Sequence, residues 1–144
     1  MASINTGKVI VGGLAAGVVM NVIDFASNMY ILADRMKADF DKLNPVLWTN
    51  MNDMSKLPGF LATDFVLGIL LVWTYAAIRP RFGAGAGTAM KAGLLIWLTG
   101  TSIAYYLMLA GLFSTGTFLY MSCLSLVNFL VSAWVGAKLY SEAA

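Results

Sequence analysis

The sequence predicts an all-α membrane protein, an antiparallel bundle of four transmembrane helices with a short interfacial helix in the first loop. Of its 144 residues, 60% are hydrophobic and 11% are charged, whereas a soluble domain carries about a quarter charged residues. The apolar residues also form four blocks, and about 20 residues suffice for one helical span. These blocks cover about residues 9–33, 60–78, 89–113 and 116–138. We therefore expect residues 1–144 to form a single integral membrane domain.

The first block carries a polar stripe within its apolar sequence. At about 100° per residue, Gly13, Gly17, Asn21, Asp24 and Asn28 fall within an arc of roughly 80° on one helix face. A carboxylate that faces lipid is destabilising by several kcal/mol, so this face is expected to point toward protein or a water-filled cavity. The two glycines, four residues apart, also allow another helix to approach closely.

Residues 34–58 form the only substantial loop between the apolar blocks. Within it Met36, Phe40 and Leu43 recur at helical spacing, while the charged residues lie mostly on other faces. This pattern is typical of a short helix on the membrane surface. Pro45 should end the helix, because the residue before a proline is disfavoured in helical geometry. A solvated connector is the alternative.

The remaining spans are ordered by their turns. Arg79-Pro80-Arg81 is expected to close the second span, and a flexible, glycine-rich turn follows at residues 82–87. A tight turn around residues 114–116 joins the third and fourth blocks, so these must be antiparallel neighbours. Basic residues favour the cytoplasmic side, and those between the second and third blocks form a cluster free of acids. We therefore expect both termini to be cytoplasmic.

Polar residues of all four spans lie at similar depth, toward the first-loop side of the membrane. We predict that they surround one polar pocket that opens toward the first loop. Its members are Asn21, Asp24, Asn28, Asp64, Thr101, Ser102, Tyr105, Ser122, Ser125 and Asn128.

No Lys or Arg occurs within the spans at the depth of this pocket. Asp24 would then be protonated, strongly hydrogen-bonded, or paired with a cation from elsewhere. An Asp24 that exchanges a proton or binds a cation is therefore one hypothesis. The structural alternatives are hydrogen bonding between packed helices and, for Asp64, a favourable position near a helix N-terminus.

Two stretches, GLLIWLTGT and SLVNFLVSAWVGAKLY, resemble those of small, uncharacterised bacterial integral membrane protein families. The order of span, 25-residue loop, span, Arg/Gly turn and paired spans is also similar to theirs. The resemblance implies a four-helix architecture and a bacterial inner membrane. It implies no activity and no catalytic residues.

The composition argues against several functions. The chain has no histidine, which removes the commonest metal ligand and the usual proton shuttle. We predict no catalytic residues, no metal site and no cofactor, and we do not expect an enzyme. The net charge of +2 is too small to indicate a nucleic-acid partner. The expected partners are the lipid bilayer and other membrane protein subunits, or further copies of this chain.

Two hypotheses for the function follow from these expectations. The leading one is a non-catalytic accessory or structural subunit of a membrane complex or homo-oligomer. The alternative is a small transporter or ligand-binding bundle that uses Asp24 and Asn28 in the polar pocket.

Overall fold

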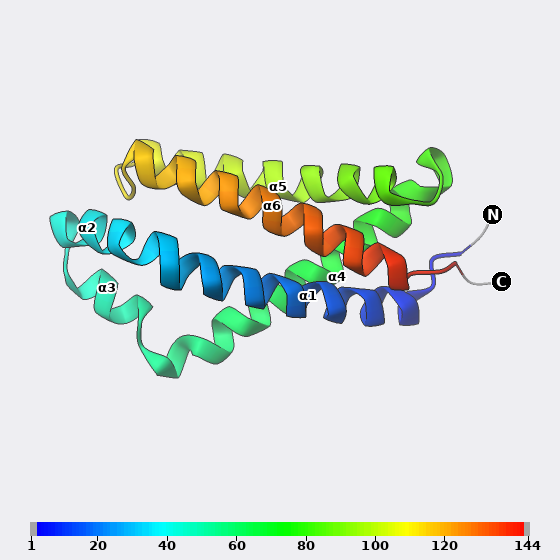
Figure 1. The fold of residues 1–144 in the computed structure, drawn as a ribbon, viewed down its shortest axis with the longest axis horizontal. Helices are drawn as coiled ribbons and strands as arrows, with labels where there is room; N and C mark the ends of the chain where they lie inside the picture. Colours follow the sequence, from blue (N-terminus) through cyan, green and yellow to red (C-terminus); the bar gives the residue numbers. More distant parts are fainter. Residues whose placement is uncertain (1–2, 143–144) are drawn as a thin grey trace.

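The computed structural model describes residues 3–142, and within them every regular element is helical. Four of the helices are long and apolar enough to cross a membrane (Figure 1), which confirms the predicted all-α class. In chain order the elements are α1 (Thr6–Ser27), a π-helical turn (Asn28–Leu32), α2 (Ala33–Leu43), α3 (Val46–Met51), a 3₁₀ turn (Met54–Lys56), α4 (Leu57–Phe82), α5 (Ala86–Leu109) and α6 (Thr115–Leu139).

The helix predicted in the first loop forms as α2, but it continues α1 (Figure 1) and is not a separate element. Together they make one helix of 38 residues, Thr6–Leu43. At 1.5 Å per residue this is about 57 Å, well beyond a hydrocarbon core of about 30 Å. Six of the 11 residues of α2 are charged, so α2 is the part that extends beyond the lipid. It ends at Asn44, which has extended backbone before Pro45, as predicted.

The sequence predicted that Arg79-Pro80-Arg81 would close the second span, but the helix does not stop at Pro80. Helix α4 runs through this residue to Phe82. A proline removes one backbone N–H donor. Because Pro80 lies so near the end of α4, the lost hydrogen bond affects only the last turn of the helix. The helix ends instead at Gly83, whose φ of 82° favours glycine.

Glycines bring α1 into backbone contact with α4 and α6. A Cβ atom added to Gly13 would lie 2.5 Å from Ile69 Cα, and one added to Gly17 would lie 2.8 Å from Phe65 Cα. A Cβ atom added to Gly12 would lie 2.7 Å from the carbonyl oxygen of α6 residue Gly136. No L side chain fits at such distances. The expected close approach along the small-residue face of span one is therefore present, and it involves two partner helices.

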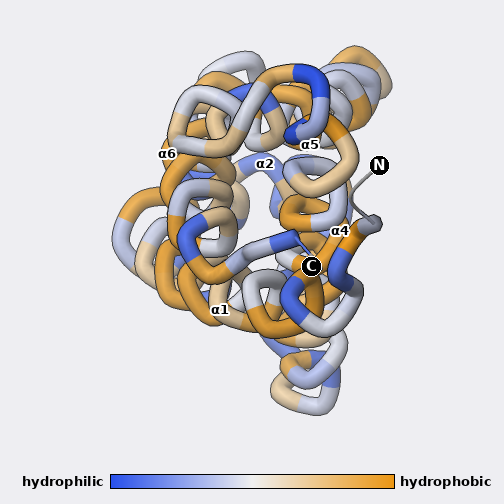
Figure 2. The backbone as a smooth tube through the Cα atoms, turned by 90° about the vertical axis from the view of Figure 1, so that its right-hand side faces the viewer, coloured by the Kyte–Doolittle hydropathy of each residue, from blue (hydrophilic) through white to orange (hydrophobic). Residues whose placement is uncertain are grey.

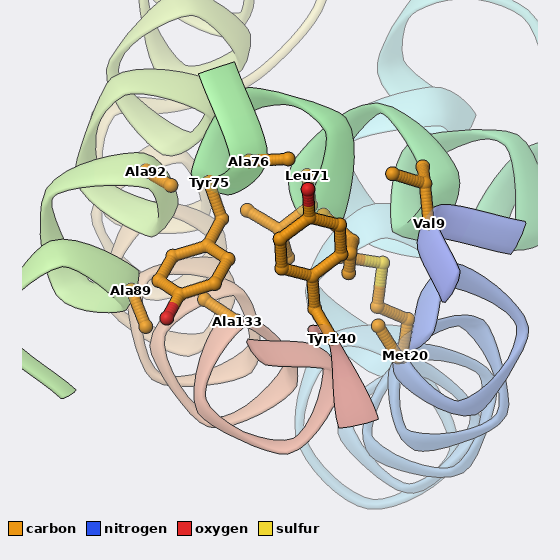
Figure 3. Close-up of a cluster of buried hydrophobic side chains, with 11 residues drawn as sticks. Val9, Met20, Leu71, Tyr75, Ala76, Ala89, Ala92, Ala133 and Tyr140 are labelled. Atoms are coloured by element: carbon orange, nitrogen blue, oxygen red, sulfur yellow. The ribbon is translucent and has the colours of Figure 1, made fainter. Parts of the chain in front are cut away.

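The main apolar core lies where α1 begins and α6 ends (Figure 3). Two buried tyrosines pack there edge to face, with the ring centroids of Tyr75 and Tyr140 5.9 Å apart. The Tyr75 hydroxyl accepts the Gly85 backbone N–H at 3.2 Å, and the Tyr140 hydroxyl accepts the Asn5 N–H at 3.3 Å. These bonds fix the turn before α5 and the segment before α1.

At the opposite end, α2 packs against the start of α6. Phe40 and its apolar neighbours on α2 form a small cluster that includes Phe113. Beside this cluster the buried Asp39 carboxylate accepts three hydrogen bonds through Oδ2. These come from Ser114 N–H and Ser114 Oγ, both at 2.9 Å, and from Thr117 Oγ1 at 2.6 Å. The carboxylate therefore holds the N-terminus of α6 against α2.

The Asp39 charge is stabilised in this position. Burial alone would raise the pKa of the Asp39 carboxyl, but the hydrogen bonds from Thr117 and Ser114 and the nearby Lys42 ammonium hold it below its ordinary value. A negative charge at a helix N-terminus is also favourable.

Hydrophobic residues occur on the outward sides of the helices as well as between them (Figure 2). On α5, for example, Leu98 and Tyr106 are 56% and 72% exposed. A helix that is hydrophobic on all sides is typical of a membrane span. The four apolar helices thus indicate a membrane protein.

Candidate functional site

A groove opens between α1 and α4. These helices touch at Gly13, Gly17 and Gly68 and then separate toward the first-loop end (Figure 1), where α3 lies between α2 and the start of α4. The groove has a volume of about 520 Å³, within the range of roughly 300–1,000 Å³ usual for small-molecule sites. We call it the α1–α4 groove. It is lined by Asn21, Asp24, Phe25, Asn28, Met29, Ala33, Trp48, Met51, Asn52, Leu57, Phe60, Leu61, Thr63 and Asp64.

The groove contains four of the residues that the sequence assigned to a pocket, namely Asn21, Asp24, Asn28 and Asp64. Asn128, on α6, does not line the groove but lies buried behind Asp24. Its amide Nδ2 donates to Asp24 Oδ1 at 2.8 Å. Asn128 therefore positions Asp24 from outside the groove.

Tyr105 and Ser125 lie elsewhere, so one pocket shared by all four spans does not form. Ser125 lines a separate hollow of about 170 Å³ between α5 and α6, together with Thr101 and Ser122. Tyr105 is 49% exposed, and its ring packs against Phe118. The reason is the order of the helices, because α6 stands between α5 and α1 (Figure 1). Similar depth along a helix does not bring residues of α5 to the groove.

Each neutral polar residue of the groove uses at least one donor group inside the protein. Each donates to a backbone carbonyl oxygen: Asn21 to Gly17 and Leu61, Asn28 to Asp24, Asn52 to Trp48, and Thr63 to Gly59. Their oxygen atoms remain as acceptors, and an ionised carboxylate is an acceptor only. The polar side chains of the groove therefore offer mainly acceptors. The side-chain donors that remain among the lining residues are one amide N–H each of Asn28 and Asn52 and the Trp48 indole N–H.

The two acidic residues face the groove from different helices. Asp24 comes from α1 and Asp64 from α4, and both side chains line the same groove. Ion pairs within residues 3–142 join Lys37 to Asp41, Lys42 to Asp39 and Arg79 to Glu142. Neither Asp24 nor Asp64 takes part in them, and no Lys or Arg lines the groove. The described part of the chain thus supplies no cation to balance these two carboxyl groups.

Sequence reasoning missed the contribution of α3 and of the π-helical turn. Trp48 and Met51, both on α3, line the groove, although the sequence assigned neither of them to the polar pocket. Asn28 and Met29 belong to the π-helical turn Asn28–Leu32. Short π-helical turns are rare in proteins, and those that do occur frequently lie at functional sites. No pattern in the sequence marks this one.

The bond between Asp24 and Asn128 leads to a prediction on stability. Asp24→Leu should destabilise the protein more than Asp24→Asn, because Asn keeps an oxygen that can accept from Asn128 Nδ2. Loss of one buried partner costs about 1–3 kcal/mol. Thermal unfolding of both variants in mild detergent measures the difference. Equal melting temperatures would show that this bond contributes no stability.

Comparisons of the chain with protein-family models, with curated proteins and with solved structures gave no match. The fold and the groove define only a broad class, that of four-helix membrane proteins with a groove large enough for a small molecule. The function is therefore inferred from the geometry and chemistry of the groove.

Proposed function

We propose that this protein is a non-catalytic membrane protein that binds a single-chain amphiphile in the α1–α4 groove. This is the ligand-binding alternative of the two hypotheses from the sequence. The observation that supports it most is the combination of eight apolar lining residues with the carboxyl groups of Asp24 and Asp64 in one groove.

The distribution of residues along the groove fits such a ligand. Along the continuous helix Thr6–Leu43 the lining runs from Asn21 to Ala33, which is about 18 Å at 1.5 Å per residue. Most polar residues lie at the inner end, and the outer end toward α3 is mainly apolar. The side chains of Phe25 and Phe60 are 67% and 49% exposed, so a ligand can enter from the bilayer.

Contacts with other subunits of a larger assembly would involve a surface other than the groove. The outer face of α5, which carries Leu98 and Tyr106, is separated from the groove by α6. The binding function is the same whether the chain acts alone, as a homo-oligomer or as an accessory subunit.

A binding experiment with brominated octyl amphiphiles tests the proposal. Bromine quenches tryptophan fluorescence on contact, and Trp48 lines the groove. The protein is placed in phosphatidylcholine nanodiscs and titrated with octyl chains that carry an amine, an alcohol or a carboxylate. At least one of them should quench saturably, and the signal should disappear in Trp48→Phe.

Two alanine variants provide the matched control. Ala33→Phe fills the groove, whereas Ala62→Phe adds the same ring at an exposed position of α4 that does not line it. Saturable quenching should be lost in the first variant and kept in the second. The proposal fails if none of the amphiphiles saturates, or if Ala33→Phe binds as well as the unmodified protein.

We further propose that the protein lies in a bacterial inner membrane with cytoplasmic termini, as the distribution of basic residues predicts. Single cysteines at Ser55 and Ala84, in a Cys123→Ser background, test the orientation. Ala84 is a better labelling site than its neighbour Gly85, because the φ of 126° at Gly85 would strain a cysteine. In intact cells an impermeant maleimide should label Ser55→Cys only. Exclusive labelling of Ala84→Cys would reverse the orientation.

A further inference from the structure

We infer that the head group of the ligand is a primary ammonium bound between Asp24 and Asp64. This inference rests on the proposed function and specifies its ligand. It is supported by two observations that are independent of the apolar walls. One is the pair of carboxyl groups without a basic residue in the lining. The other is that every neutral polar lining residue donates to a backbone carbonyl oxygen, so that these side chains offer mainly acceptors to the groove.

These observations discriminate between head groups. An anionic head group would be repelled by two carboxylates, and no basic residue lines the groove to bind it. An alcohol can donate one hydrogen bond but does not balance charge. A trimethylammonium group carries charge but has no N–H. A primary ammonium carries one positive charge and three donors, which match the oxygen atoms of Asp24, Asp64 and the Asn28 amide.

A metal ion fits the groove less well. Among the described residues there is no group of three or more His, Cys, Asp or Glu side chains that could hold one. Mg²⁺ and Ca²⁺ require about six to eight oxygen ligands, whereas most of this lining is apolar. The same apolar residues suit an alkyl chain attached to the ammonium.

We infer a single-chain amine and not a phosphatidylethanolamine lipid. In that lipid a phosphate lies beside the ammonium, so it would face the same two carboxylates without a basic residue to bind it. The groove volume of about 520 Å³ also lies in the range of sites for small molecules. The chain of a single-chain amine would follow the apolar outer half, past Met29, Phe60 and Trp48.

The order of affinities tests the inference. In phosphatidylcholine nanodiscs, which contain no N–H head group, quenching of Trp48 should saturate first with brominated octylammonium. Octanol and octyltrimethylammonium should bind at least about ten- to a hundredfold more weakly, because the loss of each hydrogen bond to a charged group has about this effect. Octanol lacks two of the three ammonium donors, and octyltrimethylammonium lacks all three. Octanoate should not bind measurably.

The matched control is the double variant Asp24→Asn/Asp64→Asn. Partition of each amphiphile into the lipid does not depend on these side chains, so any change in quenching reports binding to the groove. It should lose the preference for ammonium and keep its affinity for octanol. Asp64→Asn alone should show part of this loss without destabilisation, because Asp64 belongs to none of the ion pairs among the described residues.

The outcomes separate this inference from the proposed function. If octanol binds the unmodified protein as tightly as octylammonium, the groove function stands and the ammonium inference is overturned. If the double variant keeps the ammonium preference, the assignment to Asp24 and Asp64 is overturned. Displacement of octylammonium by phosphatidylethanolamine in the nanodisc would overturn the choice of a single-chain amine. If none of the amphiphiles binds, both the function and the inference fail.

Discussion

Gly68→Ala is expected to destabilise the bundle severely, although alanine is the better helix former by about 1 kcal/mol. The added Cβ atom would collide with the carbonyl oxygen of Gly13 and would lie 2.6 Å from the backbone nitrogen of Gly17. Both neighbours are backbone atoms of α1, so no side chain can rotate to make room and the helices must separate. We expect a loss at or above the upper end of the about 1–3 kcal/mol typical of overpacking.

The control for this prediction is Gly100→Ala, in the middle of α5. An added Cβ atom meets nothing within 4 Å at Gly100, so this variant should be as stable as the unmodified protein or slightly more stable. Thermal unfolding in mild detergent compares the two. Similar melting temperatures for Gly68→Ala and Gly100→Ala would contradict the backbone contact between α1 and α4.

The larger substitution Gly17→Ile should disrupt folding of the monomer itself, because its Cβ atom would lie 2.8 Å from Phe65 Cα. Size-exclusion chromatography distinguishes misfolding from loss of assembly. A stable Gly17→Ile monomer that has only lost a partner would show that this face of α1 docks other proteins and does not pack within the bundle.

Asp39→Ala is expected to have the second-largest effect. The substitution removes the acceptor of three hydrogen bonds from Ser114 and Thr117 at the start of α6. A hydrogen bond to a charged group contributes about 1.5–3 kcal/mol, so the free energy of unfolding should decrease by at least this amount.

The control is Asp41→Ala, because Asp41 is exposed and pairs only with Lys37 on the helix surface. Surface pairs at this spacing contribute about 0.3–0.5 kcal/mol. Equal effects of both variants in thermal unfolding would contradict the role of Asp39.

The same carboxylate leads to a dependence on pH. The pKa of Asp39 is lower in the folded protein than its ordinary value, which is about 3.9. Its contribution to stability is therefore fully present at neutral pH and is lost as the pH falls below about 4, through the folded pKa. The difference in melting temperature between the unmodified protein and Asp39→Asn should decrease over that range. A constant difference would mean that the charge of Asp39 does not matter.

The sequence predicts those features that depend on one helix at a time. The 100° rotation per residue places Gly13, Gly17 and Asp24 on one face, and that face does meet another helix and the groove. The order of the helices around the bundle depends on contacts between distant segments. For this reason the depth of Tyr105 within span three did not reveal that α6 separates it from the groove.

The first loop gives a second example of the same limit. Its helical spacing correctly predicts a helix that contains Met36 and Phe40. Spacing alone does not reveal that this helix continues the axis of α1, because the π-helical turn Asn28–Leu32 has no sequence signature. The position of Trp48 in the groove likewise depends on how the chain returns from α2 to α4.

Photolabelling in a bilayer tests the central claim, that the α1–α4 groove holds an amphiphile, most directly. An octylammonium that carries a diazirine on its chain is illuminated with the protein in phosphatidylcholine nanodiscs, and the labelled peptides are mapped by mass spectrometry. If the amphiphile occupies the groove, the labels should be concentrated in residues 25–33 and 57–61. This labelling should be lost in Ala33→Phe and kept in Ala62→Phe. Labels spread over the outer face of α5, or labels that Ala33→Phe leaves unchanged, would contradict the claim.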